Sequence, residues 1–214
     1  ASRIHHKLDD FEQAISAAQT AQSLLEPLRR ADPRQPDVLR SLVNAYRAHG
    51  RALDSDFKTA DAVAAIEPAV PLCEQLVAQF PSVEHYRDLL NVLGTLANLR
   101  HDARLDLDRA EVYLHRQLSL VQAARELFPD VSWDEQEASF HHWYGRLLAT
   151  RQQYSEARDH YRESIRIGEQ LLEDNPSSTR IKHDLVHVLF YFGNLPEGDP
   201  ESTEVEAMLH RGIE

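Results

Sequence analysis

The chain has 214 residues, 42% of them hydrophobic, and its 23 basic against 35 acidic side chains give a formal charge of −12. That balance argues against nucleic acid as a partner, because phosphate binding needs clustered Lys and Arg. No apolar run is long enough to span a bilayer and the start does not resemble a signal peptide, so we expect no membrane and a cytoplasmic location.

Nearly the whole chain shows the three- and four-residue spacing of apolar side chains that is typical of amphipathic helices. Residues 4–8 resemble the last turn of a helix, and Asp9-Asp10 is predicted to form the turn after it. The helices that follow are predicted over residues 11–31, 37–50, 59–80, 82–100, 107–128, 133–151 and 153–176. The last of these ranges includes the stop signal Asn175-Pro176, and one more helix is predicted after it, through Phe192.

Three prolines stand inside these predicted helices. Proline lacks a backbone donor and clashes with the preceding turn, so it kinks or breaks a helix. Pro27 should therefore kink the first long helix, and Pro68 with Pro71 should split the helix over 59–80 near Glu67.

Several helix boundaries carry local signals. Ser132 and Glu135 have the spacing of a capping box, which sets the next helix start one residue after the serine. A tight turn is predicted at Gln152. Either Ser177 or Ser178 is expected to cap the helix that follows Pro176.

One small residue recurs at a fixed place in successive helices. Nineteen residues before Pro33, Pro81, Pro129 and Pro176 stand, in order, Ala14, Ala62, Ala110 and Ala157. Their spacings are 48, 48 and 47, and another 48 reaches Val205, where a fifth copy starts after the polar loop 194–202. The residues four positions after the alanines are Ala18, Ile66, Leu114 and Tyr161. A period of this length indicates a helical repeat array. The single cysteine, Cys73, excludes an internal disulfide framework, and its place in the same apolar register predicts a buried thiol.

The expected fold class is therefore all-α. We predict one repeat domain over residues 1–214, built as a right-handed α-α superhelix of antiparallel helix pairs. Its units are expected over about residues 1–33, 34–81, 82–129, 130–176 and 177–214. Because the first copy begins at once and the last is cut short, the sequence is expected to be a piece of a longer protein.

The spacing of small and aromatic residues resembles the tetratricopeptide repeat. Gly145 and Ala157 are 12 residues apart, as are Gly193 and Val205, and Tyr161 follows Ala157 by four. The segment LCEQLVAQFPSVEHYRDLLNVLGTLANL is similar to the extended tetratricopeptide regions that follow kinase domains in many planctomycete and myxobacterial serine/threonine kinases. The present repeat is longer than the usual one, and no kinase motif occurs. The resemblance implies a protein-interaction region.

In tetratricopeptide proteins the first helix of each pair lines a concave surface that holds an extended peptide, so the resemblance also implies groove residues. Carried over by register from the glycines at positions 94, 145 and 193, they are Asp88, Asn91, Thr95, Asn98, His142, Arg146, His187 and Asn194. Amide side chains both donate and accept, so Asn91 and Asn98 suit a bound backbone. The alternative is that these residues are solvated positions or helix caps.

An enzyme hypothesis starts from the histidines. His183 and His187 have the i, i+4 helical spacing that can hold zinc, and Asp184 loosely resembles the glutamate of HExxH, although it is one carbon shorter. No third ligand is identifiable from the spacing, and the His141-His142 pair is interpreted as half-buried helix surface. The sequence shows neither a glycine-rich phosphate loop nor a nucleophile with a recognisable base. We therefore predict no enzyme, no metal and no cofactor.

The functional prediction is a scaffold module that binds a peptide or protein partner, within a bacterial signalling protein. The negative charge of the chain would steer a basic partner toward it. A self-associating structural module is the alternative, and a zinc-dependent hydrolase is the least favoured hypothesis.

Overall fold

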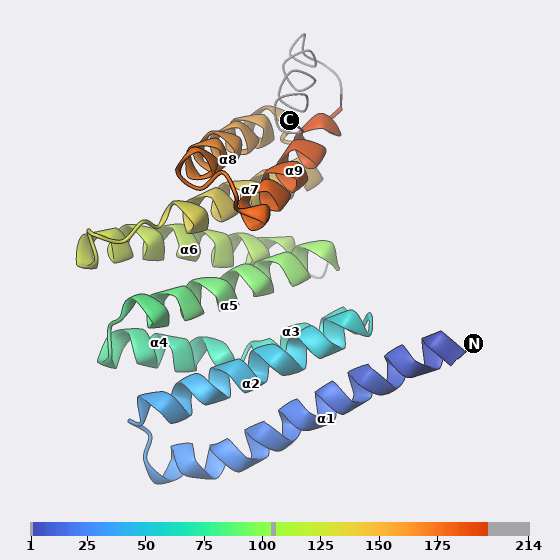
Figure 1. Cartoon of the computed structure of the whole chain (residues 1–214), viewed down its shortest axis with the longest axis vertical. Helices are drawn as coiled ribbons and strands as arrows, with labels where there is room; N and C mark the ends of the chain where they lie inside the picture. Colours follow the sequence, from blue (N-terminus) through green and yellow to red (C-terminus); the bar gives the residue numbers. More distant parts are fainter. Residues whose placement is uncertain (1, 104–105, 197–214) are drawn as a thin grey trace. The chain divides into compact units, whose positions relative to one another are not determined.

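The computed structural model describes residues 2–103 and 106–196, with side chains from residue 10 onward. All regular elements in those ranges are α-helices, nine in number (Figure 1). Their bounds are α1 Ser2–Ala31, α2 Pro36–Ser55, α3 Thr59–Ile66, α4 Ala69–Gln79, α5 Val83–Asp102, α6 Leu107–Leu127, α7 Asp134–Thr150, α8 Tyr154–Asp174 and α9 Thr179–Gly193. The expected all-α class is confirmed for the ranges described. None of these helices is long and apolar enough to cross a membrane.

The chain forms two compact units, Ala1–Arg116 and Gln117–Glu214, and the boundary between them lies inside α6. The single repeat domain and its five unit boundaries stay predictions. Val205 and most of the polar loop 194–202 lie outside the described residues.

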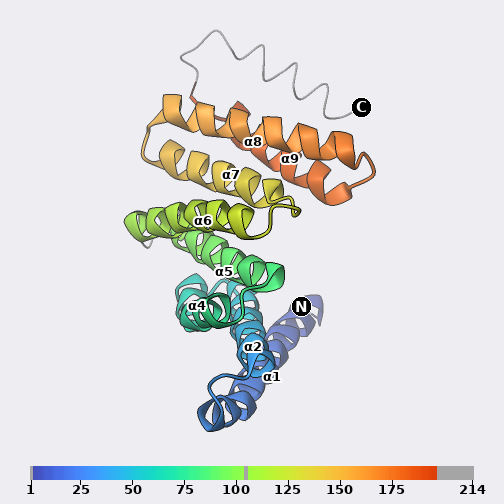
Figure 2. The same cartoon turned by 90° about the vertical axis from the view of Figure 1, so that its left-hand side faces the viewer.

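In the first unit each helix packs on its neighbours in the chain. Helix α1 lies along α2, which contacts both α3 and α4, and α5 packs on the same two short helices (Figures 1 and 2). The expected split near Glu67 is confirmed, since α3 ends at Ile66 and α4 begins at Ala69. Pro68 and Pro71 have no backbone N–H to continue one helix. Cys73 of α4 is fully buried, as expected, and burial raises the pKa of its thiol to about 12.

The start of the chain differs from the prediction. Helix α1 is continuous from Ser2, so the turn expected at Asp9-Asp10 is wrong. Aspartate is only a weak helix former and neither residue removes a backbone donor, so propensity alone does not end a helix there. The helix also continues past Pro27 and ends at Ala31.

The second unit is organised around α8, which packs on both α7 and α9 (Figure 2). Its core takes side chains from all three helices, in agreement with the apolar stripe predicted for residues 153–176. The buried members are Leu148, Ala157, Tyr161, Ile165, Ile181, Leu185, Val188, Leu189 and Phe192.

The alanine register marks buried positions in three of the four described copies. Ala62, Ala110 and Ala157 are fully buried, whereas Ala14 is exposed. In the first copy the register alanine is therefore not a buried position. The reason is that α1 extends back to Ser2 and no described helix precedes it, so only α2 covers it.

Small residues allow two of the helix pairs to approach closely. A Cβ atom on Gly145 would lie 2.9 Å from the Tyr161 ring and 3.3 Å from the Ala157 carbonyl oxygen. Gly50 has the same role, because a Cβ there would lie 2.2 Å from the Ile66 side chain. Tyr161 and Ile66 both stand four residues after a register alanine. The sequence drew attention to the 12-residue spacing of Gly145 and Ala157, whereas Gly50 was not singled out there.

Polar contacts recur between residues about one period apart. In the first unit Arg40 donates to Asp88, 48 positions on, and Tyr113 donates to Glu67 across 46. In the second unit Arg180 pairs with Glu135 across 45. Within each unit, then, successive helix pairs are in direct contact, as a repeat array requires.

Two of the predicted boundary signals are confirmed. Ser178 caps α9, its hydroxyl oxygen accepting from the Ile181 N–H at 3.4 Å. The turn at Gln152 has a positive φ of 64°, a conformation that lets the chain reverse between α7 and α8.

The predicted capping box at Ser132 and Glu135 is wrong. The N-cap of α7 is the buried Trp133, which makes no side-chain capping bond. The Ser132 hydroxyl does accept from an early backbone N–H, that of Asp134 at 3.4 Å, and it also donates to the Asp134 carboxylate at 3.0 Å. The Glu135 carboxylate pairs with Arg180 of α9. The Glu135 carboxylate therefore pairs with a distant helix instead of forming the capping-box bond at the start of its own helix.

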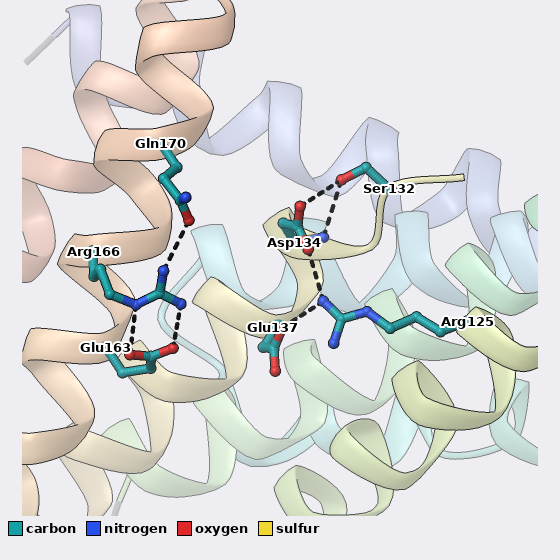
Figure 3. Close-up of polar contacts among 7 residues, drawn as sticks. All are labelled: Arg125, Ser132, Asp134, Glu137, Glu163, Arg166 and Gln170. Atoms are coloured by element: carbon teal, nitrogen blue, oxygen red, sulfur yellow. Dashed lines mark hydrogen bonds and ion pairs between the residues drawn. The ribbon is translucent and has the colours of Figure 1, made fainter. Parts of the chain in front are cut away.

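A polar network joins the end of α6 to the start of α7 (Figure 3). The Arg125 guanidinium donates to the carboxylates of Asp134 at 2.7 Å and Glu137 at 2.5 Å. On α8, Arg166 donates to both carboxylate oxygens of Glu163, at 2.9 and 2.6 Å (Figure 3). Asp134 and Glu137 also place negative charge in the first turn of α7, where the helix dipole favours it.

Candidate functional site

A cavity of about 270 Å³ opens in the second unit, bounded by α7, α8 and α9. Its floor comes from the second half of α8, and its walls come from the first halves of α7 and α9. The apolar lining residues are Ala138, Trp143, Gly168, Leu171, Ile181, Leu185 and Val188, and the polar ones are Glu135, Ser139, His142, Ser164, Arg180, His183, Asp184 and His187. An apolar interior with a few polar groups is typical of ligand sites.

The exposed side of the cavity carries opposite charges from two helices. Arg180 of α9 pairs with Glu135 of α7, and its guanidinium lies 4.0 Å from Asp184 one helical turn further on. These side chains are 38 to 61% exposed, so the ion pairs are weak and open to exchange with a ligand.

His142 is the buried polar residue of this site. The side chain is 8% exposed, and its Nε2 atom has no hydrogen-bond partner. Its ring stacks on Trp143 at a centroid distance of 4.9 Å. Burial, and then the charges of Arg146 and His187, lower the pKa of His142 to about 3. The imidazole is therefore neutral at physiological pH.

Arg146 lies over two aromatic rings beside His142. Its guanidinium carbon is 4.6 Å from the centroid of Trp143 and 4.3 Å from that of Tyr191. Contacts this short are typical of cation–π pairing, which places a positive charge where it acts on His142.

Of the four predicted groove residues in this unit, the structure brings three together. His142 and His187 both line the cavity, and the charge of Arg146 acts on His142. Asn194 is placed differently, because it follows the end of α9 and its amide donates to the Phe190 carbonyl at 2.6 Å. It therefore caps a helix, which was the alternative interpretation.

The other four predicted residues lie on α5 in the first unit. Asp88 is 7% exposed, and its carboxylate accepts from Arg40 at 2.9 Å and lies 3.7 Å from Arg47. A ligand would have to compete with both guanidinium groups for it. The Thr95 hydroxyl donates to the Asn91 carbonyl one turn earlier.

The remaining groove candidates on α5 differ in exposure. The Asn91 side chain is exposed and Asn98 is half-buried. Their part in partner binding stays a prediction.

The sequence did not indicate Trp143, Glu135 or Arg180 as site residues. Trp143 follows the predicted His142, so an aromatic beside a groove position was the available signal. Glu135 and Arg180 are 45 residues apart and meet only because α7 and α9 flank α8.

The histidine pair considered for zinc lies on α9. The rings of His183 and His187 are 4.4 Å apart between centroids, and both side chains are exposed. Within the part of the chain that the structure describes, no group of three or more His, Cys, Asp or Glu side chains is placed to hold a metal ion.

We expect the buried imidazole to make stability depend on pH. Below pH 6.5 the unfolded chain binds a proton at His142 that the folded chain excludes down to about pH 3, so stability falls as the pH is lowered through this window. From pH 8 to pH 5 the loss should be about 2 kcal/mol. Urea unfolding across this range measures it.

The control for that prediction is His142→Phe, which keeps a ring but removes the titration. Burial also lowers the pKa of His49 and His141, so part of the pH dependence should persist in this variant. Equal slopes for the variant and the natural chain would contradict the assignment to His142.

Comparison with known proteins bears on the fold alone. No family model and no curated protein sequence matches the chain. Among solved structures it is similar to the crystal structure of BtubC (BKLC) from P. vanneervenii, with 14% sequence identity and a TM-score of 0.50. The match covers 95% of this chain and 89% of the other. A likeness at this level of identity concerns the fold alone.

Proposed function

We propose that the chain is a protein-interaction module, a tetratricopeptide-like superhelix that holds an extended peptide segment of a partner in the cavity between α7 and α9. The observation that carries this proposal is the cavity itself. Its walls come from the first helices of two successive pairs, its interior is apolar, and its exposed side is polar. Such a groove takes side chains of a peptide as anchors while the rim pairs with its polar groups.

The setting of the module is also part of the proposal. The formal charge of −12 supports a partner with a basic surface, because the field of the chain raises its encounter rate. The resemblance to regions beside serine/threonine kinases supports a place in cytoplasmic bacterial signalling.

Selection of peptides from a displayed random library on the full chain tests the proposal. Synthetic peptides from the enriched set are then measured by fluorescence anisotropy against two variants. Ser139→Phe fills the cavity from α7, and Ser155→Phe adds the same ring to an exposed position on α8. We expect Ser139→Phe to weaken binding at least about tenfold and Ser155→Phe to leave it unchanged.

Two results would count against the peptide-binding function. If the selection enriches no peptide, the proposal that the chain binds peptides is contradicted. If the selected peptides bind both variants equally well, the proposal that they bind in the cavity is contradicted. Circular dichroism of Ser139→Phe establishes that the variant is folded before the comparison is made.

Self-association is the second candidate, favoured by exposed apolar pairs one turn apart. Leu24 and Leu28 on α1 are 67% and 52% exposed, and Val186 and Phe190 on α9 are 51% and 60% exposed. Sedimentation over a concentration series separates the candidates, because a strict monomer at high concentration contradicts self-association.

A further inference from the structure

One residue that lines the cavity has a buried polar atom whose bonding the folded chain leaves incomplete. Nε2 of His142 is buried and unpartnered in a residue that lines the cavity, whereas the neighbouring Ser164 hydroxyl donates to the Ala138 carbonyl at 2.9 Å. An unpaired buried nitrogen is unfavourable, and such atoms in folded proteins call for an explanation. A ligand group that completes its bonding would be favoured at this point.

The depth of His142 decides which part of a peptide can reach it. Because the residue is 8% exposed, a backbone that runs along the rim stays too far away, and only a side chain inserted between α7 and α9 can approach. The walls beside it are apolar, with Trp143, Leu185 and Val188 among them. A side chain with an apolar body and a polar tip matches this arrangement.

The charges around His142 limit which chemical group can form the polar end of the inserted side chain. Arg146 and His187 already act on His142 and disfavour a positive charge beside it, so the tip of a Lys or Arg side chain is unfavourable next to this ring. A carboxylate would have to lose its hydration among mostly apolar walls. A phenol hydroxyl is uncharged, and its partially negative oxygen is stabilised by the field of Arg146.

A hydroxyl also fits either tautomer of the imidazole. If Nε2 carries no proton, the hydroxyl donates to it, and if Nε2 is protonated, the hydroxyl oxygen accepts. An indole N–H can only donate. We propose that the cavity is a socket for a tyrosine side chain, whose hydroxyl pairs with Nε2 of His142 once the ring has turned to uncover this atom. The proposal rests on the peptide-binding function and specifies its anchor.

Small analogues of the two aromatic side chains test the socket without a peptide. The full chain is titrated with p-cresol, which mimics tyrosine, and with toluene, which mimics phenylalanine, while ¹⁵N NMR follows the His142 ring. We expect p-cresol to shift the Nε2 resonance and to bind roughly 5- to 100-fold more tightly than toluene. The preference should vanish in His142→Phe and persist in Ser155→Phe, which carries an added ring at an exposed position of α8 outside the cavity.

Equal binding of p-cresol and toluene, or an unmoved Nε2 resonance, overturns the socket. The same holds for a preference that survives in His142→Phe. If this variant does not fold, the ¹⁵N shift in the natural chain decides alone. In selected peptides a Tyr→Phe change should weaken binding to the natural chain. Peptides that bind in the cavity without any tyrosine requirement would leave the interaction function intact and remove only the tyrosine anchor.

Discussion

Replacing Tyr161 with alanine is expected to lower the free energy of unfolding by about 3 to 5 kcal/mol. The ring is 1% exposed and fills the space that Gly145 leaves between α7 and α8. Its centroid also lies 6.1 Å from that of Phe192 on α9, so all three helices lose contacts. Chemical denaturation followed by circular dichroism measures the change.

A matched control for Tyr161→Ala is Phe190→Ala in the same unit. Phe190 is 60% exposed, so removal of its ring should change stability by less than about 0.5 kcal/mol. Similar losses for the two variants would show that Tyr161 does not serve as the contact between the helices.

Replacing Glu67 with glutamine is expected to destabilise the first unit by about 2 to 4 kcal/mol. The Glu67 carboxylate pairs with Arg100, whose side chain is only 10% exposed, and it accepts from the Tyr113 hydroxyl at 3.3 Å. Arg109 lies 3.3 Å from the same oxygen. Without the negative charge, the Arg100 guanidinium stays buried and uncompensated. Thermal and denaturant unfolding both report the loss.

Glu74→Gln provides the control for this buried pair. Glu74 also pairs with an arginine of α6, Arg116, but the two side chains are 37% and 41% exposed. Water and salt screen such a pair, so the change should be less than about 1 kcal/mol. If the two variants lose equal stability, burial is not what makes the Glu67 pair important.

The candidate site was predictable only in part. The register that the tetratricopeptide resemblance implies, counted from Gly145 and Gly193, selects His142, Arg146 and His187, and these three lie together. Asn194 had the same register, but it stands just past the end of α9, where an amide finds a free carbonyl. Whether a polar residue caps a helix or faces a ligand depends on where the helix ends.

The sequence by itself determined the helices and most of their ends, because those depend on local chemistry. Pro68 has no backbone N–H to donate, and the chain leaves the helix between Ile66 and Ala69. The Ser178 hydroxyl can reach the early N–H groups of any helix that follows it. The tertiary structure alone decided which partners distant residues took. Glu135 could bond to its own helix start or to Arg180, and packing of α9 against α8 supplied Arg180. Ala14 and Ala157 occupy the same register position, yet Ala14 is exposed on α1, which packs on α2, whereas Ala157 is buried on α8, which packs on both α7 and α9. Burial and ion pairing depend on which surfaces meet in space. The repeating pattern alone therefore predicts neither the exposure of Ala14 nor the pairing of Glu135 with Arg180, 45 residues further on.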